Sequence, residues 1–202
     1  QRQILIDFRQ SLLDDPSGQY WLNDGNGDFW QPENPKIFLC PDAVVVTDAK
    51  SGFFGNVEMA YKINYVRSSY SYNWHVLWLT YNAPDSSLEN KIRQPSEMPF
   101  FMDGTFFLVQ PQQNDMPATD LYNGTRPTDG DNQHQGMATI NIPRHGNRPA
   151  TISRNWPESS PLPGAINVSF LDGHIKTTKL DDLWYLKWQP EYEPPAKRPG
   201  LK

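Results

Sequence analysis

With 202 residues, of which 37% are hydrophobic and 13% aromatic, the chain is long enough to bury one substantial core. Its formal charge is −5 and its Lys and Arg residues form no run, so nothing indicates a nucleic-acid-binding protein. No stretch approaches the roughly 18 apolar residues that span a bilayer, and the chain opens at Gln1 inside an amphipathic pattern, which is compatible with the removal of upstream residues.

An amphipathic helix is predicted at the start of the chain, over 1–15. Ile4, Phe8 and Leu12 lead a set of apolar residues that recur every three or four positions. Pro16 disfavours helical backbone at the residue before it, so the helix is expected to end at Asp15. A helix this short is marginal alone, which predicts that it packs on a sheet.

Strands are expected between residues 37 and 109, where β-branched and aromatic residues are frequent. The predicted extended segments are Ile37–Cys40, Ala43–Thr47, Val57–Arg67, Tyr70–Leu79 and Phe100–Val109. Residues 110–163 are rich in Pro and polar side chains and predict two loop excursions, with a strand at Met137–Ile142 between them.

The C-terminal part, 164–192, is predicted to form a hairpin followed by a short helix. Asp172-Gly173 separates two strand-like runs, and such a pair suits a type I′ turn. The apolar positions of Leu180–Trp188 fit one face of a helix, while the Pro-rich residues 193–202 predict an extended tail along the surface. The whole chain, 1–202, is expected to form one domain.

Metal and thiol chemistry find little support in the sequence. Asp24, Asn26 and Asp28 alternate like the first half of an EF-hand loop, but the required later Gly and Glu are absent, so a turn is favoured over a partial calcium site. Cys40 is the single cysteine and is interpreted as a buried structural thiol, with an intermolecular disulfide or a nucleophile as alternatives. The histidines lack metal-ligand spacing; they are His75, His134, His145 and His174.

No signature of a nucleophile elbow, a phosphate-binding loop or a dinucleotide site is present, so the sequence predicts no enzyme. A rival interpretation is an enzyme whose site is assembled across loops, which would be favoured if His145, His174 and Asp172 met in one pocket. The aromatic content admits a second interpretation, a secreted carbohydrate-binding β module, assisted by calcium if the partial site forms, because exposed Trp and Tyr rings stack on sugars. The candidate platforms are Tyr20-Trp21, Phe29-Trp30 and Tyr70–Trp78.

The C-terminal region resembles that of bacterial prepilin-like and pseudopilin-like proteins with an H-X9-DG domain. The motif residues are Arg144-His145-Gly146 and Asn167–His174, followed by Leu183–Trp188; looser similarity extends back through Met116–Gly124, Pro99–Gly104 and Phe38–Pro41. The similarity singles out His145, Asp172, Gly173, His174, Trp184 and Trp188 as motif residues with structural roles. It implies no catalytic residue and no cofactor.

The chain departs from this family in two ways. Residues 146–171 separate His145 from Asp172, where the motif has nine, and the Pro-rich stretch 147–163 resembles an insertion. The N-terminal cleavage site and long hydrophobic helix of the family are absent from the sequence.

The resemblance implies an α+β, pilin-like fold, in which the N-terminal helix covers an antiparallel sheet. It also implies a structural subunit of a cell-envelope filament (type IV pilus-like) or of a type II secretion-like apparatus. Such a protein is exported, lies in the periplasm or at the cell surface, and contacts other pilin-like subunits. Its only contact with the membrane would be through the absent hydrophobic helix.

Overall fold

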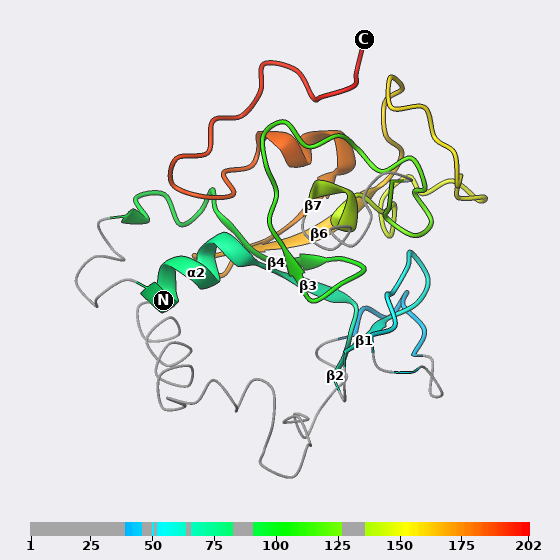
Figure 1. Ribbon diagram of the computed structural model, residues 1–202, viewed down its shortest axis with the longest axis horizontal. Coiled ribbons are helices and arrows are strands. Elements are labelled where there is room, and N and C mark those ends of the chain that lie inside the picture. Colours follow the sequence, from blue (N-terminus) through cyan, green and yellow to red (C-terminus); the bar gives the residue numbers. More distant parts are fainter. Residues whose placement is uncertain (1–38, 46–49, 51, 64–65, 83–90, 127–135) are drawn as a thin grey trace.

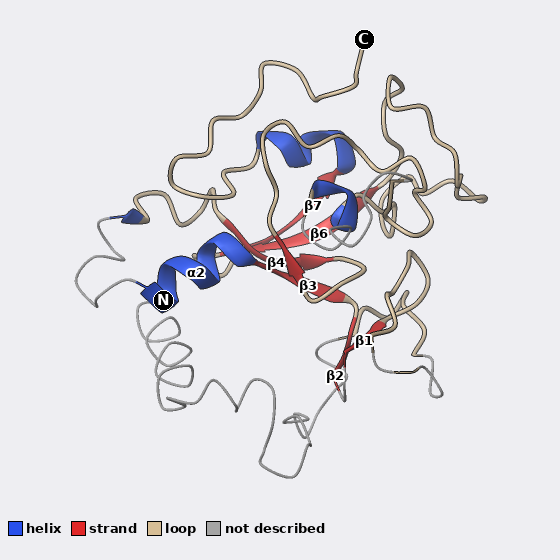
Figure 2. Ribbon diagram, viewed as in Figure 1, coloured by secondary structure: helices blue, strands red, loops and turns tan. Residues whose placement is uncertain are grey.

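The computed structural model describes residues 39–45, 50, 52–63, 66–82, 91–126 and 136–202, which form seven strands in two sheets (Figures 1 and 2). The smaller sheet is the antiparallel pair β1 (Tyr61–Ile63) and β2 (Val66–Ser68). The larger sheet has the order β5-β3-β4-β6-β7, with one parallel pair, β3 and β5. Its strands are β3 (Tyr70–Asn73), β4 (Pro99–Asp103), β5 (Leu108–Val109), β6 (Ala165–Phe170) and β7 (Ile175–Lys179).

One face of the five-stranded sheet carries the main core. Met102, Ile166 and Val168 are at most 1% exposed and belong to one cluster with Trp184 and Trp188. The two tryptophans flank the end of η4, a 3-10 helix at Leu180–Tyr185, so this irregular segment covers the sheet. Loop residues 118–121 and the 3-10 helix η3 (Met137–Ile140) complete the cover.

The expected α+β, pilin-like fold is wrong. The described residues are rich in β-structure with only short helices, and no N-terminal helix is seen packed on a sheet. The physical reason lies in the core, because the apolar sheet face is already buried by η3, η4 and loops. The predicted helix over 1–15 lies outside the described residues. None of the helices in the described part is long and apolar enough to cross a membrane.

The predicted strand Tyr70–Leu79 is half wrong, because β3 ends at Asn73 and the helix α2 (Trp74–Asn82) follows at once. Asn73 Oδ1 accepts the His75 backbone N–H at 3.0 Å, which is the bond of an N-cap. The Asn73 amide also donates to the carbonyls of Pro99 and Trp188 at 2.8 Å each, so the cap is held by the core. Val76 anchors the helix against Met98.

The hairpin around Asp172 forms as predicted, with β6 and β7 antiparallel from Ala165–Lys179 to Ser169–Ile175. Its turn differs from the expected type I′. Gly173 N–H donates to Phe170 C=O, and Phe170 N–H donates to His174 C=O, both at 2.9 Å. This is a three-residue connection, in which Gly173 takes a left-handed position at φ +90°.

Two other predicted elements are 3-10 helices instead. Met137–Ile142 was expected as a strand, but η3 occupies its first part, and Thr139 C=O accepts the Thr105 backbone N–H at 3.2 Å. The C-terminal helix spans only Leu180–Tyr185 and is not α-helical. Of the segments Ile37–Cys40 and Ala43–Thr47, the described residues contribute only an isolated bridge between Val44 and Met59.

The C-terminal tail runs over the outside of the molecule (red in Figure 1), yet one of its residues is fully enclosed. Arg198 is 1% exposed and its Nε donates to Asp181 Oδ1 at 2.6 Å. The guanidinium also donates to the backbone carbonyls of Glu158, Ser160 and Pro199. The tail is therefore tied to both η4 and the loop 147–163.

Candidate functional site

A buried polar cluster joins three distant parts of the chain beside the ends of β4 and β6. Arg144 and His145 follow η3, Asp103 ends β4, and Cys40 comes from the first described segment. Arg144 and Asp103 have side chains with no exposed surface, while the His145 side chain is 18% exposed. Charges this deep in a protein must be paired and hydrogen-bonded to be tolerated.

Arg144 satisfies that condition with all three of its guanidinium nitrogens. Its Nη1 donates to Asp103 Oδ1 at 3.1 Å and to Ser69 C=O at 2.6 Å. The remaining bonds go to backbone carbonyls of Val57, Asn56 and Gly104, at 2.8–3.3 Å. One side chain thus connects the end of β4, the loop before β1 and Ser69, which lies between β2 and β3.

His145 is held at both ring nitrogens. Nε2 lies 3.2 Å from Asp103 Oδ2 and 3.4 Å from Cys40 Sγ, and Nδ1 lies 3.2 Å from Asp42 Oδ2. The hydrogen bonds to Asp103 and then to Cys40 raise the pKa of His145 to about 10, against the opposing effect of burial. The imidazole is therefore a cation at neutral pH.

Asp103 stays ionised in this cluster. Burial acts to raise the pKa of the Asp103 carboxyl, but the His145 hydrogen bond, the Arg144 charge and the Asn167 backbone N–H together hold it below its usual range. The Asn167 N–H donates to Oδ2 at 2.8 Å, which ties the carboxylate to β6. Asp103 is thus the charged centre that joins β4, β6 and the Arg144-His145 pair.

Cys40 is fixed from two sides. Its backbone N–H donates to Ser69 Oγ at 2.6 Å, and its thiol faces His145. The residue is 2% exposed, in agreement with the interpretation of a buried thiol. A thiol beside an imidazole is the pair that thiol nucleophiles use. Here, however, the same ring nitrogen also faces the Asp103 carboxylate, and burial keeps a large substrate from Sγ.

His145 also forms a backbone bridge with Ala165, which affects how the spacing between His145 and Asp172 is counted. His145 and Ala165 exchange two N–H to C=O bonds of 2.8 Å, so the chain leaves the sheet at Gly146 and returns at Gly164. Both glycines have positive φ, +70° and +77°. With residues 147–163 set aside, Gly146 and residues 164–171 separate His145 from Asp172, which makes nine residues.

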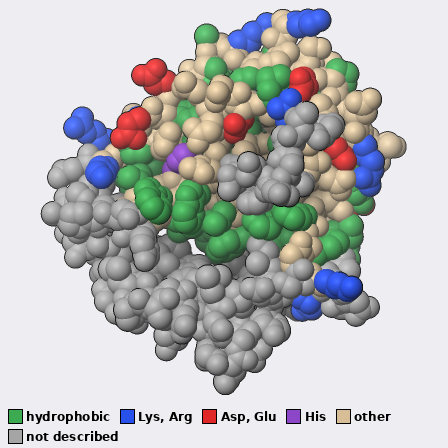
Figure 3. Space-filling view, in the orientation of Figure 1, with side chains coloured by type: hydrophobic (Ala, Val, Ile, Leu, Met, Phe, Trp, Pro, Cys, Tyr) green, Lys and Arg blue, Asp and Glu red, His purple; other side chains and the backbone are tan. Residues whose placement is uncertain are grey.

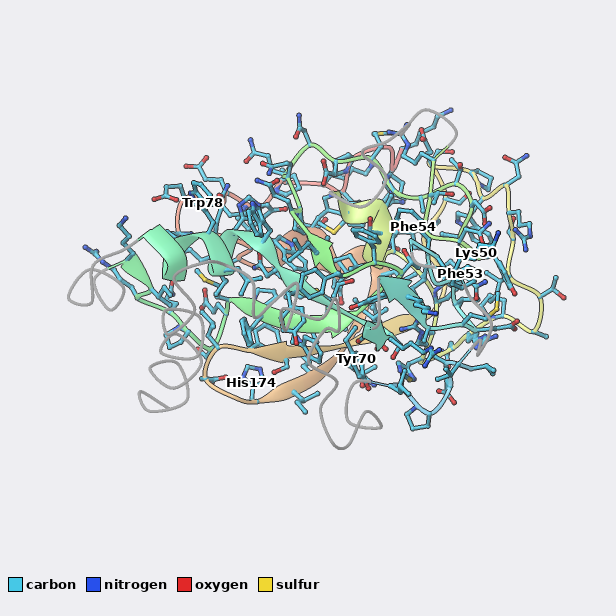
Figure 4. All side chains as sticks on the ribbon, turned by 60° about the horizontal axis from the view of Figure 1, so that its bottom comes forward. Lys50, Phe53, Phe54, Tyr70, Trp78 and His174 are labelled. Carbon is cyan, nitrogen blue, oxygen red and sulfur yellow. The ribbon has the colours of Figure 1, made fainter. Side chains whose placement is uncertain are left out.

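The remaining motif residues lie elsewhere. Asp172 and His174 flank Gly173 in the β6–β7 turn, where His174 Nδ1 lies 2.6 Å from Asp172 Oδ1 and the ring stacks on Phe170. Figure 4 shows His174 at this turn, on the outside of the molecule. His145 lies beside Ala165 at the opposite end of β6, so the structure does not bring His145, Asp172 and His174 into one pocket.

Trp184 and Trp188 are both fully buried. Trp184 Nε1 donates to Asp115 C=O at 2.8 Å, and Trp188 Nε1 donates to Leu183 C=O at 2.9 Å. Buried indoles need such acceptors. The geometry places both rings in the core as anchors and leaves no ring face for a ligand.

A pocket of about 430 Å³ lies at the other end of the sheet, beside α2. Its lining residues are Trp74, His75, Trp78, Leu79, Gln110, Gln189, Pro190 and Glu191. Trp74 and Trp78 have ring centroids 5.9 Å apart, and Trp78 is 53% exposed. Figure 4 shows Trp78 projecting outward from α2. The pocket therefore combines aromatic rings with amide and carboxylate groups.

Sequence reasoning missed the partners of His145. Asp103 was given no role of its own, and Arg144 was included only as the neighbour of His145. The available signal was an Asp in an apolar strand segment, which needs a cation if it is buried. Candidates in the remainder of the chain lie outside the described residues: Asp24, Asn26, Asp28, Trp21, Trp30 and His134.

Comparisons of the chain with protein-family models, with curated proteins and with solved structures find no match. The residues themselves therefore have to carry the functional argument.

Proposed function

We propose that the chain is a non-catalytic structural domain, exported to the cell envelope or the cell surface, where it assembles with other subunits of a filament or type II secretion-like apparatus. The observation that carries this proposal is the His145–Ala165 bridge. It closes the loop 147–163 at its base and leaves the nine-residue spacing of the H-X9-DG motif between His145 and Asp172.

The use made of the motif residues supports the same conclusion. Arg144 and His145 hold the sheet through Asp103, Gly173 makes the turn of the last hairpin, and Trp184 and Trp188 fill the core. A histidine that is cationic at neutral pH cannot accept a proton as a general base. The motif residues therefore stabilise the fold, and the proposed function, assembly with other subunits, depends on the surface of the domain.

Large hydrophobic residues on that surface offer positions for a test. Hydrophobic side chains gather in a band on the face seen in Figure 3. Over the described part of the molecule as a whole, the exposed hydrophobic residues include Val44 at 66%, Ile175 at 72% and Tyr185 at 45%. Exposed apolar surface is a common mark of contact between proteins.

The test uses the whole encoded protein, tagged in its own host, with a photo-crosslinking amino acid at Val44, Ile175 or Tyr185. Position Lys197, exposed but charged, is the matched control. We expect the protein in the envelope or outside the cell, with crosslinks from at least one apolar position to subunits of such a filament or secretion-like apparatus. A cytoplasmic protein, or one without any such crosslink, would contradict the proposal.

Saccharide binding is a second candidate function, which the pocket beside α2 favours. Indole faces stack on the C–H faces of sugars, and the side chains of Gln110, Gln189 and Glu191 offer donors and acceptors for hydroxyls. Its volume lies within the range of small-ligand sites. The pocket is separate from the Arg144-His145 cluster.

A glycan array probed with the purified chain tests this second function. Trp78→Ala should weaken any observed binding about fivefold or more, because a stacked ring contributes roughly 1 kcal/mol or more. The control Tyr185→Ala removes an aromatic residue that is 45% exposed and does not line the pocket. Absence of array binding, or equal losses in both variants, would end this interpretation.

A further inference from the structure

Three side chains with different donor atoms meet at the exposed edge of the polar cluster. Cys40, Asp42 and His145 each offer one ligand atom, and these atoms lie within 4.8 Å of one another. Among the described residues, these three form the group of His, Cys, Asp or Glu side chains that could together hold a metal ion. We propose that Cys40, Asp42 and His145 bind a divalent transition-metal ion of the zinc type.

The observed separations match the edges of a tetrahedral zinc site. Zinc binds sulfur at about 2.3 Å and nitrogen or oxygen at about 2.0–2.2 Å, which places neighbouring donors roughly 3.3–3.6 Å apart. Cys40 Sγ lies 3.4 Å from His145 Nε2, and Asp42 Oδ2 lies 3.2 Å from His145 Nδ1. The two separations involve different ring nitrogens, and one ion takes only one of them. An ion at Nδ1, beside Asp42, leaves Nε2 to Asp103. The Cys40 thiol, which lies within 4.8 Å of the Asp42 ligand atom, then has to turn toward this ion.

Neighbouring residues position the His145 ring and the backbone of Cys40 without an ion. Asp103 fixes the His145 ring and is itself fixed by Arg144 and by the Asn167 N–H. Ser69 Oγ accepts the backbone N–H of Cys40 at 2.6 Å. Carboxylates that orient a histidine ligand are a regular part of metal sites. Asp103, occupied by Arg144, is expected to remain in this supporting role.

The donor set selects the class of ion. A thiolate and an imidazole favour zinc and its transition-metal neighbours, whereas calcium and magnesium prefer oxygen ligands. Three protein ligands leave a fourth position, which water can fill at the Asp42 side.

Access also favours an ion over a larger ligand. Cys40 is 2% exposed, which shuts out a substrate, but Asp42 and His145 reach the surface at the same place. The site is separate from the saccharide pocket and does not depend on the assembly role proposed above. Either of those functions can fail without affecting it.

Cobalt(II) titration of the metal-free chain under reducing conditions tests the proposal. We expect one equivalent of Co²⁺ to produce a thiolate-to-cobalt charge-transfer band and the visible bands of tetrahedral cobalt, and Zn²⁺ to abolish both. Cys40→Ser should lose the charge-transfer band. Asp42→Asn should weaken binding about tenfold or more, in line with the loss of a site carboxylate.

Asp172→Asn is the matched control, because Asp172 is also a carboxylate beside a histidine but has no thiol near it in the described structure. It should leave the cobalt affinity unchanged. Circular dichroism checks that each variant is folded, and exposed Asp42 is the position whose replacement disturbs the fold least. A folded wild-type chain without the cobalt bands, or equal affinities for wild type and Asp42→Asn, would overturn the proposal.

Discussion

His145 and Ala165 exchange both of their backbone hydrogen bonds, at 2.8 Å each, although the loop 147–163 lies between them. The pair forms a small ladder outside the regular strands and fixes where β6 begins. The side chain of the same histidine meets Asp103, whose Oδ2 accepts the Asn167 N–H of β6. The backbone of His145, directly, and its side chain, through Asp103, thus both hold β6 in place.

The first prediction concerns the two glycines Gly164 and Gly173, both of which have positive φ, +77° and +90°. A Cβ at Gly164 would lie 2.6 Å from Pro143 Cβ, while a Cβ at Gly173 meets nothing within 4 Å. Gly173→Ala should cost about 1 kcal/mol of unfolding free energy, from backbone strain alone. Gly164→Ala should cost about 1–3 kcal/mol more, from overpacking.

Urea denaturation of both variants measures the difference. The comparison isolates the close approach, because φ is positive and similar at the two sites. Equal midpoints would show that Gly164 is not pressed against Pro143.

The second prediction concerns the buried ion pair. Arg144→Met should lower the unfolding free energy by about 3–5 kcal/mol, because it leaves the Asp103 charge buried with only His145 to balance it. Arg148→Met is the control, since its ion pair with Glu58 has side chains that are 28% and 49% exposed. Its cost should stay below about 1 kcal/mol. Thermal or urea unfolding measures both, and similar losses would count against a structural role for Arg144.

The third prediction concerns pH. The pKa of His145 is raised from 6.5 to about 10 in the folded chain, so its contribution to stability is complete below pH 6.5 and is lost as the pH rises toward 10. Unfolding free energy should therefore fall across this interval in the wild type. His145→Gln should be less stable at low pH and should lose much of this slope.

Urea midpoints measured from about pH 6 to about pH 9.5 provide the measurement. His75 is expected to behave in the opposite way. Burial lowers the pKa of His75, so its contribution to the unfolding free energy is lost as the pH falls. If the slope of His145→Gln above pH 7 equals that of the wild type, the His145–Asp103 ion pair does not stabilise the fold.

The fourth prediction concerns the tail. Arg198→Met should cost about 1–3 kcal/mol, because the carbonyls of Glu158 and Ser160 lose their donor. Lys197→Met is the control, since the neighbouring Lys197 is exposed. Limited proteolysis should then cleave the tail faster in Arg198→Met alone. A tail equally resistant in both variants would mean that Arg198 does not hold it.

Local sequence signals predicted the elements whose conformation is decided by neighbouring residues. The Asp172-Gly173 hairpin is the best example, since a turn pair between two β-rich runs leaves few alternatives. Even there the turn type was wrong, because the two-residue and three-residue connections differ in register and both accept a Gly. The helix over Trp74–Asn82 was missed because its residues favour strands, although Asn73 carried an N-cap signal.

The sequence by itself determined the hairpin at Gly173 and the buried state of Cys40. Only the tertiary structure decided what covers the sheet and what surrounds His145. Both depend on contacts between residues far apart in the chain, such as Arg144 with Asp103 or Cys40 with His145. Local propensity contains no information on such contacts, because their energy comes from burial and charge pairing that exist only once the segments have met.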